Sequence, residues 1–163
     1  MLSLRPLHEA DLQLTFEWEN LPELWKVSEQ QGPFNMTEIE TFHAKCLDKD
    51  NHEIERFVIN LESTPIGAVD IFEYDRTNHH CGLGIFIASM EYRYKGYGTE
   101  ALNQALAILE QRGCNLIRSI IYTNNTSSRR VFLNAGFSEG AAIIYNNRPA
   151  HQFIWKKKYE LTH

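Results

Sequence analysis

A basic, glycine-containing turn joins an apolar segment to a strongly helical one. Residues 93–101 read Arg-Tyr-Lys-Gly-Tyr-Gly-Thr-Glu-Ala. The preceding residues 81–89 (CGLGIFIAS) are too apolar and β-branched for a loop, whereas the apolar residues from Ala101 to Leu109 recur at helical spacing. The chain therefore passes from a strand through the turn into a helix, and its fold must accommodate this crossover.

The first turn of that helix is suited to binding an anion. Its backbone N–H groups have no acceptor within the helix, and the helix dipole adds partial positive charge at the same end. Gly96 and Gly98 let a ligand approach the main chain, and Arg93 and Lys95 add full charges. We interpret the turn as a pyrophosphate cradle. The alternative is an ordinary flexible connection whose charged side chains are only solvated.

Length and composition limit the class of protein. The 163 residues suffice for one core, and we expect a single domain over residues 1–163. Cys46, Cys81 and Cys114 are odd in number and widely spaced, which is typical of reduced cysteines in a cytoplasmic protein. The sequence shows no secretory signal and no apolar run long enough to span a membrane. The net charge of −5 argues against a nucleic-acid-binding protein.

The charges are unevenly distributed along the chain. Residues 111–138 contain no Asp or Glu, yet they contain Arg112, Arg118, Arg129 and Arg130. If this stretch and the glycine turn share one face, that face suits a polyphosphate, and the acidic remainder suits a cationic partner. Taken alone, each arginine is more simply explained as a solvated surface residue.

Hydrophobic periodicity and turn signals predict an ordered series of elements. Strands are expected at residues 2–5, 56–61, 66–74, 80–89, 116–122, 137–145 and 151–158. Helices are expected at residues 9–19, from about 21, at 37–47, from the glycine turn to about 112, and at 126–135. Leu12, Phe16 and Trp18 should face inward on the first helix, and Thr37 with Glu40 forms an apparent capping box. The second to fourth strands should form an antiparallel meander.

The order of elements contains a single strand–helix–strand crossover, which separates two possible uses of the glycine turn. Residues 96–101 match Gly-x-Gly-x-x-Ala, the pattern of dinucleotide-binding folds. Such folds repeat the crossover and place an acid at the end of the next strand, but residues 122–124 read Tyr-Thr-Asn. The nicotinamide interpretation therefore fails on context. No Gly-x₄-Gly-Lys-Ser/Thr motif is present, which excludes a P-loop hydrolase.

Three motifs in order carry a family resemblance. Residues 93–98 (Arg-x-x-Gly-x-Gly) are followed by 125–128 (Asn-x-x-Ser) and 131–137 (Val-Phe-x-x-Ala-Gly-Phe), and the chain opens with Leu-Arg-Pro at 4–6. Together these motifs resemble the GNAT superfamily of acetyl-coenzyme A dependent N-acetyltransferases, near ribosomal-protein N-terminal and spermidine acetyltransferases. The resemblance covers residues 2–159. It implies an α/β (α+β) fold with a mixed, largely antiparallel seven-stranded sheet and helices on both faces.

The resemblance also implies where acetyl-coenzyme A would bind. Backbone N–H groups of the glycine turn would hold its pyrophosphate, and the strand edge before the turn would pair with the pantetheine amides and polarise the thioester carbonyl. Asn125 would anchor the pantetheine arm, although it is also a natural N-cap for the next helix. The implied contacts are Ile85, Phe86, Ile87, Arg93, Tyr94, Lys95, Gly96, Tyr97, Gly98, Thr99, Asn125 and Ser128.

The residues for proton transfer depart from the family pattern. Relatives place a glutamate where this chain has Gly82 and a tyrosine where it has Phe132. We take Asp70 and Glu73 as candidate bases, which strand alternation would place on opposite faces, and either is equally well explained as a surface acid. Tyr122 is the candidate proton donor.

Tyr97 is a second candidate donor, although a tyrosine near a core more often simply packs there. No His pair has spacing suited to a metal, so we expect none.

The acceptor would be a small-molecule amine or a protein N-terminus, held near Trp18, Trp25 and Glu29, where aromatic rings and an acid suit a cation. Each tryptophan is also a good core residue. The resemblance is compatible with a monomer or a homodimer. Because Gly82 and Phe132 replace the family's usual residues, a non-catalytic coenzyme A binding or regulatory module remains the alternative to an amine acetyltransferase.

Overall fold

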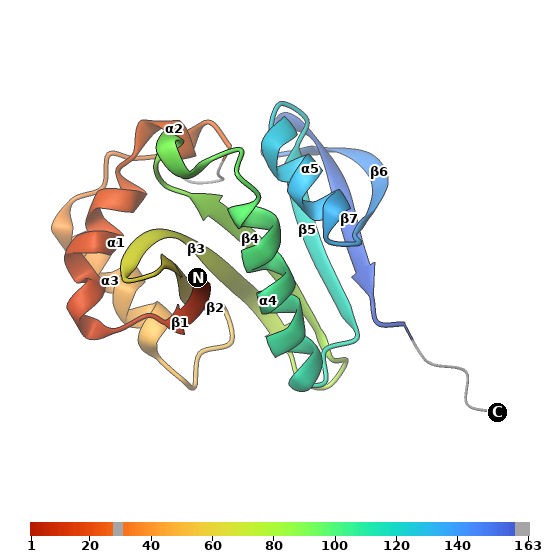
Figure 1. The fold of residues 1–163 in the computed structure, drawn as a ribbon, viewed down its shortest axis with the longest axis horizontal. Helices are drawn as coiled ribbons and strands as arrows, with labels where there is room; N and C mark the ends of the chain where they lie inside the picture. Colours follow the sequence, from red (N-terminus) through yellow and green to blue (C-terminus); the bar gives the residue numbers. More distant parts are fainter. Residues whose placement is uncertain (28–30, 159–163) are drawn as a thin grey trace.

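One mixed sheet runs through the molecule and is covered by helices on both faces. The computed structural model describes residues 1–27 and 31–158, in which seven strands have the order β1-β2-β3-β4-β5-β7-β6 (Figure 1). The strands are β1 (Leu2–Pro6), β2 (Ile54–Leu61), β3 (Thr64–Asp75), β4 (His80–Ile87), β5 (Leu116–Tyr122), β6 (Ser138–Tyr145) and β7 (Arg148–Lys156). Neighbours are antiparallel except β4 and β5. The predicted fold class is confirmed.

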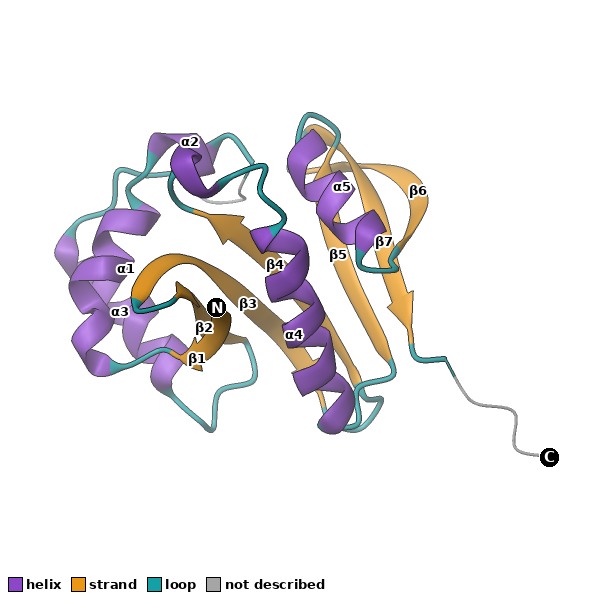
Figure 2. Cartoon of the chain, in the orientation of Figure 1, coloured by secondary structure: helices purple, strands orange, loops and turns teal. Residues whose placement is uncertain are grey.

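The helices follow the order predicted from periodicity. The α-helices are α1 (Leu12–Glu19), α2 (Pro22–Trp25), α3 (Met36–Leu47), α4 (Tyr97–Gln111) and α5 (Thr126–Asn134), and short 3₁₀ turns occupy Glu9–Asp11 and Met90–Tyr92. Figure 2 shows α4 and α5 side by side on one face of the sheet. The first half of the chain supplies α1 and α3 to the other face.

Strand alternation divides the core into two layers. In β2, Phe57 and Ile59 belong to the buried cluster that contains α4, whereas Val58 between them packs with Trp18 of α1. Because successive side chains of a strand point to opposite faces, a strand covered on both sides reads as a continuous apolar run. This explains why β2 to β4 were recognisable as strands without an alternating pattern.

The first helix differs from the prediction in its inward face. Residues 9–11 form the 3₁₀ turn, and the buried side chains of α1 are Thr15 and Trp18, whereas Leu12 and Phe16 are only partly buried. Thr15 is buried because its hydroxyl lies 2.9 Å from Nδ1 of the buried His43 on α3. A satisfied polar pair therefore occupies a position where periodicity favoured an apolar side chain.

Two other boundaries are corrected. The capping box of α3 is formed by Asn35 and Glu38, whose side chains bond each other's backbone N–H at 2.8 and 3.1 Å, and not by Thr37 and Glu40. The last hairpin turns at Asn146 and Asn147, with φ of 49° and 60°, so β7 begins at Arg148, earlier than predicted. Positive φ at both central residues gives the two-residue turn that matches strand twist.

Candidate active site

The sheet opens between β4 and β5. These parallel strands pair at only three positions, from His80 with Leu116 to Gly82 with Arg118. On its other edge β4 stays paired with β3 as far as Ile87. The edge of β4 facing β5 therefore has no strand partner over residues 83–87. Apart from the Ile87 carbonyl, which accepts from Arg93, the backbone groups on this edge are available to an extended ligand.

The glycine turn ends at an uncapped helix. Gly96 is the N-cap of α4 with φ of 85°, a conformation that favours glycine, and no side chain caps the helix. The N–H of Glu100 donates to the Gly96 carbonyl at 3.1 Å, but the N–H groups of residues 96–99 make no hydrogen bond to any residue described by the structure. Four donors and the positive end of the helix dipole therefore face outward together.

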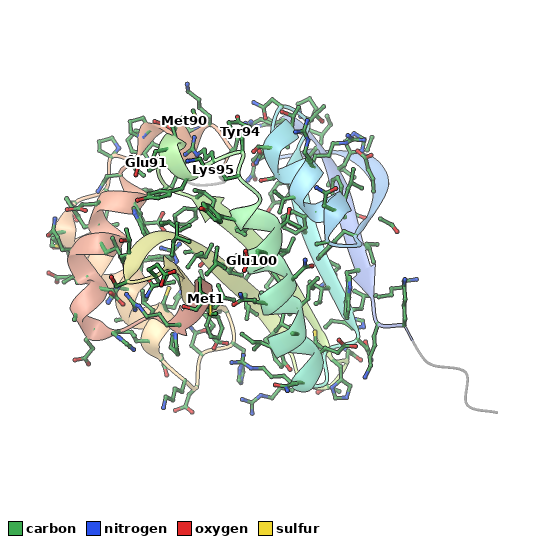
Figure 3. All side chains as sticks on the ribbon, viewed as in Figure 1. Met1, Met90, Glu91, Tyr94, Lys95 and Glu100 are labelled. Carbon is green, nitrogen blue, oxygen red and sulfur yellow. The ribbon has the colours of Figure 1, made fainter. Side chains whose placement is uncertain are left out.

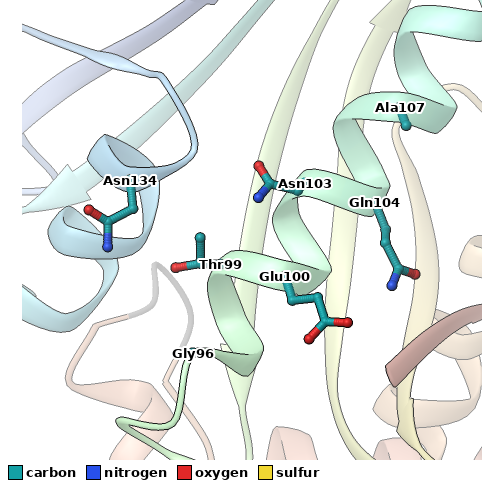
Figure 4. Close-up of a pocket in the computed structure, with 7 residues that line it drawn as sticks. All are labelled: Gly96, Thr99, Glu100, Asn103, Gln104, Ala107 and Asn134. Atoms are coloured by element: carbon teal, nitrogen blue, oxygen red, sulfur yellow. The ribbon is translucent and has the colours of Figure 1, made fainter. Parts of the chain in front are cut away.

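An open groove of about 640 Å³ adjoins this turn, within the range typical of ligand sites. It is lined by Gly96, Thr99, Glu100, Asn103, Gln104, Ala107 and Asn134. Thr99 and Asn103 extend from α4 toward the side of α5 that carries Asn134 (Figure 4). The groove therefore offers neutral hydrogen-bonding side chains, together with the carboxylate of Glu100, next to the exposed helix end.

Arg93 makes its described hydrogen bonds within the protein. Its Nε and Nη2 donate to the carbonyls of Ile87 and Ala88 at 2.9 and 3.3 Å, and its Nη1 donates to Glu23 of α2 at 2.9 Å. The guanidinium thus ties the glycine turn to the end of β4. Tyr94 and Lys95, in contrast, are exposed at the surface (Figure 3).

Asn125 is the N-cap of α5. Its Oδ1 accepts the N–H of Ser128 at 3.2 Å, as expected for capping, while its Nδ2 makes no hydrogen bond to a described residue. The middle of α5 lies close to the start of α4, because a Cβ at Gly98 would be 3.3 Å from Cγ2 of Val131. The first turn of α4 and α5 are therefore neighbours.

Asp70 lies on the sheet face that carries α1 and α3, in a buried ionic cluster. Both its carboxylate oxygens accept from Arg56, at 2.7 Å from Nε and 2.9 Å from Nη2. Arg56 also donates to Glu19 of α1 at 2.8 Å, and its side chain is only 2% exposed. Burial opposes the charge of this guanidinium, yet attraction from Asp70 and Glu19 raises its pKa overall.

Glu73 lies toward the far end of β3. A bulge between Phe72 and Asp75 interrupts the ladder, and Glu73 is exposed there with φ of 51°. The simple alternation used to place Asp70 and Glu73 on opposite faces does not apply across this bulge. Phe72 pairs with Gly82 and Asp75 with His80, so Glu73 lies opposite the start of β4, at the end remote from the glycine turn.

The position of the family's usual glutamate is covered by an aromatic ring. A Cβ at Gly82 would overlap Cε2 and Cδ2 of Phe72 on β3. The ring of Phe72 therefore occupies the space that a side chain at position 82 would need. Phe132 is likewise a core residue, 1% exposed, whose ring packs edge-on against Phe137 at 4.8 Å between centroids.

The contact between Phe72 and Gly82 predicts coupled stabilities. Gly82→Ala should cost about 1–3 kcal/mol of unfolding free energy, because the ring must move to admit a methyl group. In a Phe72→Ala background the same change should cost little. Gly84→Ala is the control, since a Cβ there would be 3.5 Å from Cε1 of Phe72. Urea unfolding measures all variants, and an equal cost in both backgrounds would contradict the contact.

Tyr122 is the last residue of β5, the second strand that borders the opening. It is 5% exposed, the guanidinium carbon of Arg148 lies 3.8 Å from its ring centroid, and Nδ2 of Asn146 is 3.5 Å from its hydroxyl. Arg148 also donates to the carbonyl of Lys26 at the end of α2. The start of β7 thus bridges Tyr122 to the N-terminal helices. Tyr97 packs beside the α4 core cluster.

The aromatic residues predicted to surround the acceptor are partly structural. Trp18 is 7% exposed and packs edge-on against Phe86 at 5.5 Å. Trp25 donates its Nε1–H to the carbonyl of Glu19 at 2.8 Å. Glu29 lies outside the described residues. Among those that are described, no group of three His, Cys, Asp or Glu side chains is arranged to hold a metal.

Sequence reasoning did not single out Glu19, Arg56 or Phe72. Arg56 had a usable signal, because a charged residue lies within the otherwise apolar strand Arg-Phe-Val-Ile and must find a partner when buried. Its partners could not be read from the sequence. None of the described helices is long and apolar enough to span a bilayer.

Comparisons with known proteins agree with this geometry. The sequence matches the family model for the acetyltransferase (GNAT) domain over residues 1–138. A spermidine N-acetyltransferase from Vibrio cholerae, solved with CoA and spermine, is similar with a TM-score of 0.85 and 20% identity, covering 95% of each chain. The aminoglycoside acetyltransferase AAC(6')-Ib, solved with ribostamycin and coenzyme A, has a TM-score of 0.82 and 18% identity, covering 96% of this chain and 93% of its own.

The search of curated proteins finds no significant match. The family model nevertheless includes β1 to β5, the glycine turn and α5, which are the elements that create the opening and the uncapped helix. The resemblance inferred from residues 93–98, 125–128 and 131–137 is confirmed. The chain belongs to the GNAT family of acetyltransferases.

Proposed function

We propose that this protein transfers an acetyl group from acetyl-coenzyme A directly to a primary amine. The observation that carries the proposal is the unpaired edge of β4, which leads to an uncapped helix N-terminus. One site can thus pair with the amides of an extended arm and hold a diphosphate at its end. Acetyl-coenzyme A supplies the activated thioester. The described geometry fits such a ligand.

The coenzyme site would be divided among three segments. The N–H groups of residues 96–99 would donate to the pyrophosphate, with Tyr94 and Lys95 beside them and Arg93 holding the turn in place. Main-chain groups of residues 85–87 would pair with the pantetheine. Asn125, through its unused Nδ2, and Ser128 would contact the arm from α5. Each charge-assisted contact of this kind contributes roughly 1.5–3 kcal/mol.

The acceptor would approach from the sheet face that carries α1 and α3. Holding amine and thioester in line can supply roughly 7–11 kcal/mol, so transfer does not depend on the glutamate that Gly82 replaces. Tyr122 would protonate the leaving thiolate. Trp18 and Trp25 would contribute to the wall, and the proposal also includes Glu29, which lies outside the described residues. Acceptors of this class include polyamines, aminosugars and protein N-termini.

The proposed setting is the cytoplasm, since Cys46, Cys81 and Cys114 are free thiols. A monomer or a homodimer satisfies the proposal equally. The competing function, a non-catalytic coenzyme A binding module, is favoured by one observation, namely that Phe72 covers the position of the usual catalytic glutamate. The two functions differ in whether the protein releases the coenzyme A thiol from acetyl-coenzyme A when an amine is added.

A thiol-release screen tests the proposal. Purified protein is mixed with acetyl-coenzyme A and, in separate reactions, spermidine, kanamycin or a peptide with a free N-terminus. We expect thiol release that depends on one of these amines, with the acetylated amine identified by mass spectrometry. Coenzyme A binding by calorimetry without release from any amine would instead support the binding module.

A further inference from the structure

Three charged side chains meet on the sheet face that carries α1 and α3. Arg56 of β2 lies between Asp70 of β3 and Glu19 at the end of α1. The Arg56 guanidinium carbon is 5.1 Å from the ring centroid of Phe42 and 5.2 Å from that of Phe86. Two aromatic rings thus flank the cation while the carboxylates bind it at its edge.

The cluster does not balance its own charge. Two carboxylates against one guanidinium leave one net negative charge, although the exposed fractions of the Asp70 and Glu19 side chains are only 19% and 24%. A partly buried net charge is unfavourable unless a counter-charge reaches it. A ligand that brings one positive charge would complete the cluster.

The two carboxylates differ in how many of their oxygens already accept a hydrogen bond. Asp70 uses both oxygens on Arg56. Glu19 uses only Oε1, and its Oε2 has no hydrogen bond to any part of the chain that the structure describes. Glu19 is therefore the one of the two carboxylates with an oxygen that makes no hydrogen bond to a described residue and can accept from an incoming cation.

The cluster adjoins the strand segment that would hold the thioester. Phe86 belongs to the unpaired stretch of β4, and its ring touches both Trp18 and the Arg56 guanidinium. Asp70 pairs across the ladder with Gly84, which has no side chain to block the approach. Phe86 thus links the unpaired edge of β4 to the guanidinium that Glu19 binds.

We propose that Glu19 is the residue that binds the ammonium of the acceptor and accepts its proton. This inference rests on the proposed function. The ammonium donates a proton to Oε2 of Glu19, and the freed nitrogen lone pair forms a bond to the thioester carbonyl carbon. The carbon–sulfur bond then breaks, and the thiolate leaves with its electron pair and takes a proton from Tyr122, the donor in the proposed function. The nitrogen loses its second proton to water, from which Tyr122 is reprotonated, and Glu19 releases its proton to solvent.

Arg56 and Asp70 are positioning residues in this scheme. Asp70 fixes the guanidinium by two hydrogen bonds, and the guanidinium fixes Oε1 of Glu19. Burial also raises the pKa of Glu19, outweighing the attraction of Arg56. A carboxylate with a raised pKa is closer to the operating pH, which makes it a more effective proton acceptor.

Glu19→Gln tests the assignment with the fastest amine found in the screen. Glutamine keeps the hydrogen bond to Arg56 but cannot accept a proton, so kcat/KM should fall by about 10²–10⁴. The exposed Glu17→Gln on the same helix is the matched control and should change little. Coenzyme A affinity, measured by calorimetry, should be unchanged in both variants.

The pH profile separates a proton acceptor from a structural role. The unmodified protein should show a plateau in kcat/KM between the pKa of Glu19 and that of the amine. In Glu19→Gln the rate should instead rise about tenfold per pH unit with the neutral amine. A Glu19→Asp variant, which retains a carboxylate, should keep the plateau at a lower rate and serves if Glu19→Gln folds poorly.

Three results would overturn the assignment. The first is a Glu19→Gln enzyme that keeps the plateau, and the second is a Glu19→Asp enzyme that loses it. The third is an Asp70→Asn enzyme whose rate rises with the neutral amine while that of Glu19→Gln does not, which would assign the role to Asp70. An unmodified protein that binds coenzyme A but acetylates no amine would instead refute the proposed function, and that outcome is recognised before any variant is made.

Discussion

A Gly98→Asp variant is expected to lose coenzyme A binding while keeping its fold. Gly98 is in the first turn of α4, where the unpaired N–H groups of residues 96–99 face outward. A carboxylate there repels the diphosphate and competes for the same donors. Loss of two charge-assisted contacts of about 1.5–3 kcal/mol each corresponds to roughly 10²–10⁴ in affinity.

The same substitution should not unfold the protein. An acidic residue in the first turn interacts favourably with the helix dipole by about 0.3–1 kcal/mol, which offsets the close contact of a new Cβ, 3.3 Å from Val131. Gly98→Ala is the matched control, because it adds the same Cβ without charge. Calorimetry with coenzyme A and thermal unfolding by circular dichroism measure both effects. Equal losses of affinity in the two variants would show that bulk, and not charge, is responsible.

Most of the fold could be predicted because its signals are local. The apolar, β-branched run of β5 was predicted at Leu116–Tyr122, which are its observed bounds. Periodicity predicted α4, and Gly136, with φ of 97°, ends α5 as expected. The errors arose where two local patterns competed. Thr37 and Glu40 imitate the capping box that Asn35 and Glu38 form, because both pairs have the same spacing.

In the candidate site, too, the part that depends on neighbouring residues was predictable and the part that depends on distant residues was not. The glycine turn was recognisable because a phosphate-binding helix start is encoded in a few consecutive residues. The cluster of Glu19, Arg56 and Asp70 was not, because it combines α1, β2 and β3 through pairs separated by 37 and 14 residues. Asp70 alone looked like a free acid. Only the fold reveals that Arg56 already occupies both its oxygens.

That cluster predicts a large effect on stability. Arg56→Met keeps much of the side-chain volume between Phe42 and Phe86 but leaves two partly buried carboxylates without their cation. Removing one partner of a buried ionic group typically costs about 3–5 kcal/mol. Arg112→Met is the matched control, since Arg112 pairs with Glu55 at side-chain exposures of 39% and 41%, and such surface pairs contribute at most about 1 kcal/mol.

The deficit of Arg56→Met should also depend on pH with a definite sign. Burial already raises the pKa of Glu19, and attraction from Arg56 opposes that rise, so without the guanidinium the pKa moves further up. A carboxyl whose pKa is higher in the folded than in the unfolded chain stabilises the fold below the unfolded value, about 4.3 for Glu, and that stability is lost as pH rises through the folded value. The free-energy difference from the unmodified protein should therefore be smaller near pH 4.5 than at pH 7.5. Urea unfolding at both pH values measures it, and a deficit that is constant, or that grows as pH falls, would mean that lost packing and not unpaired charge destabilises the variant.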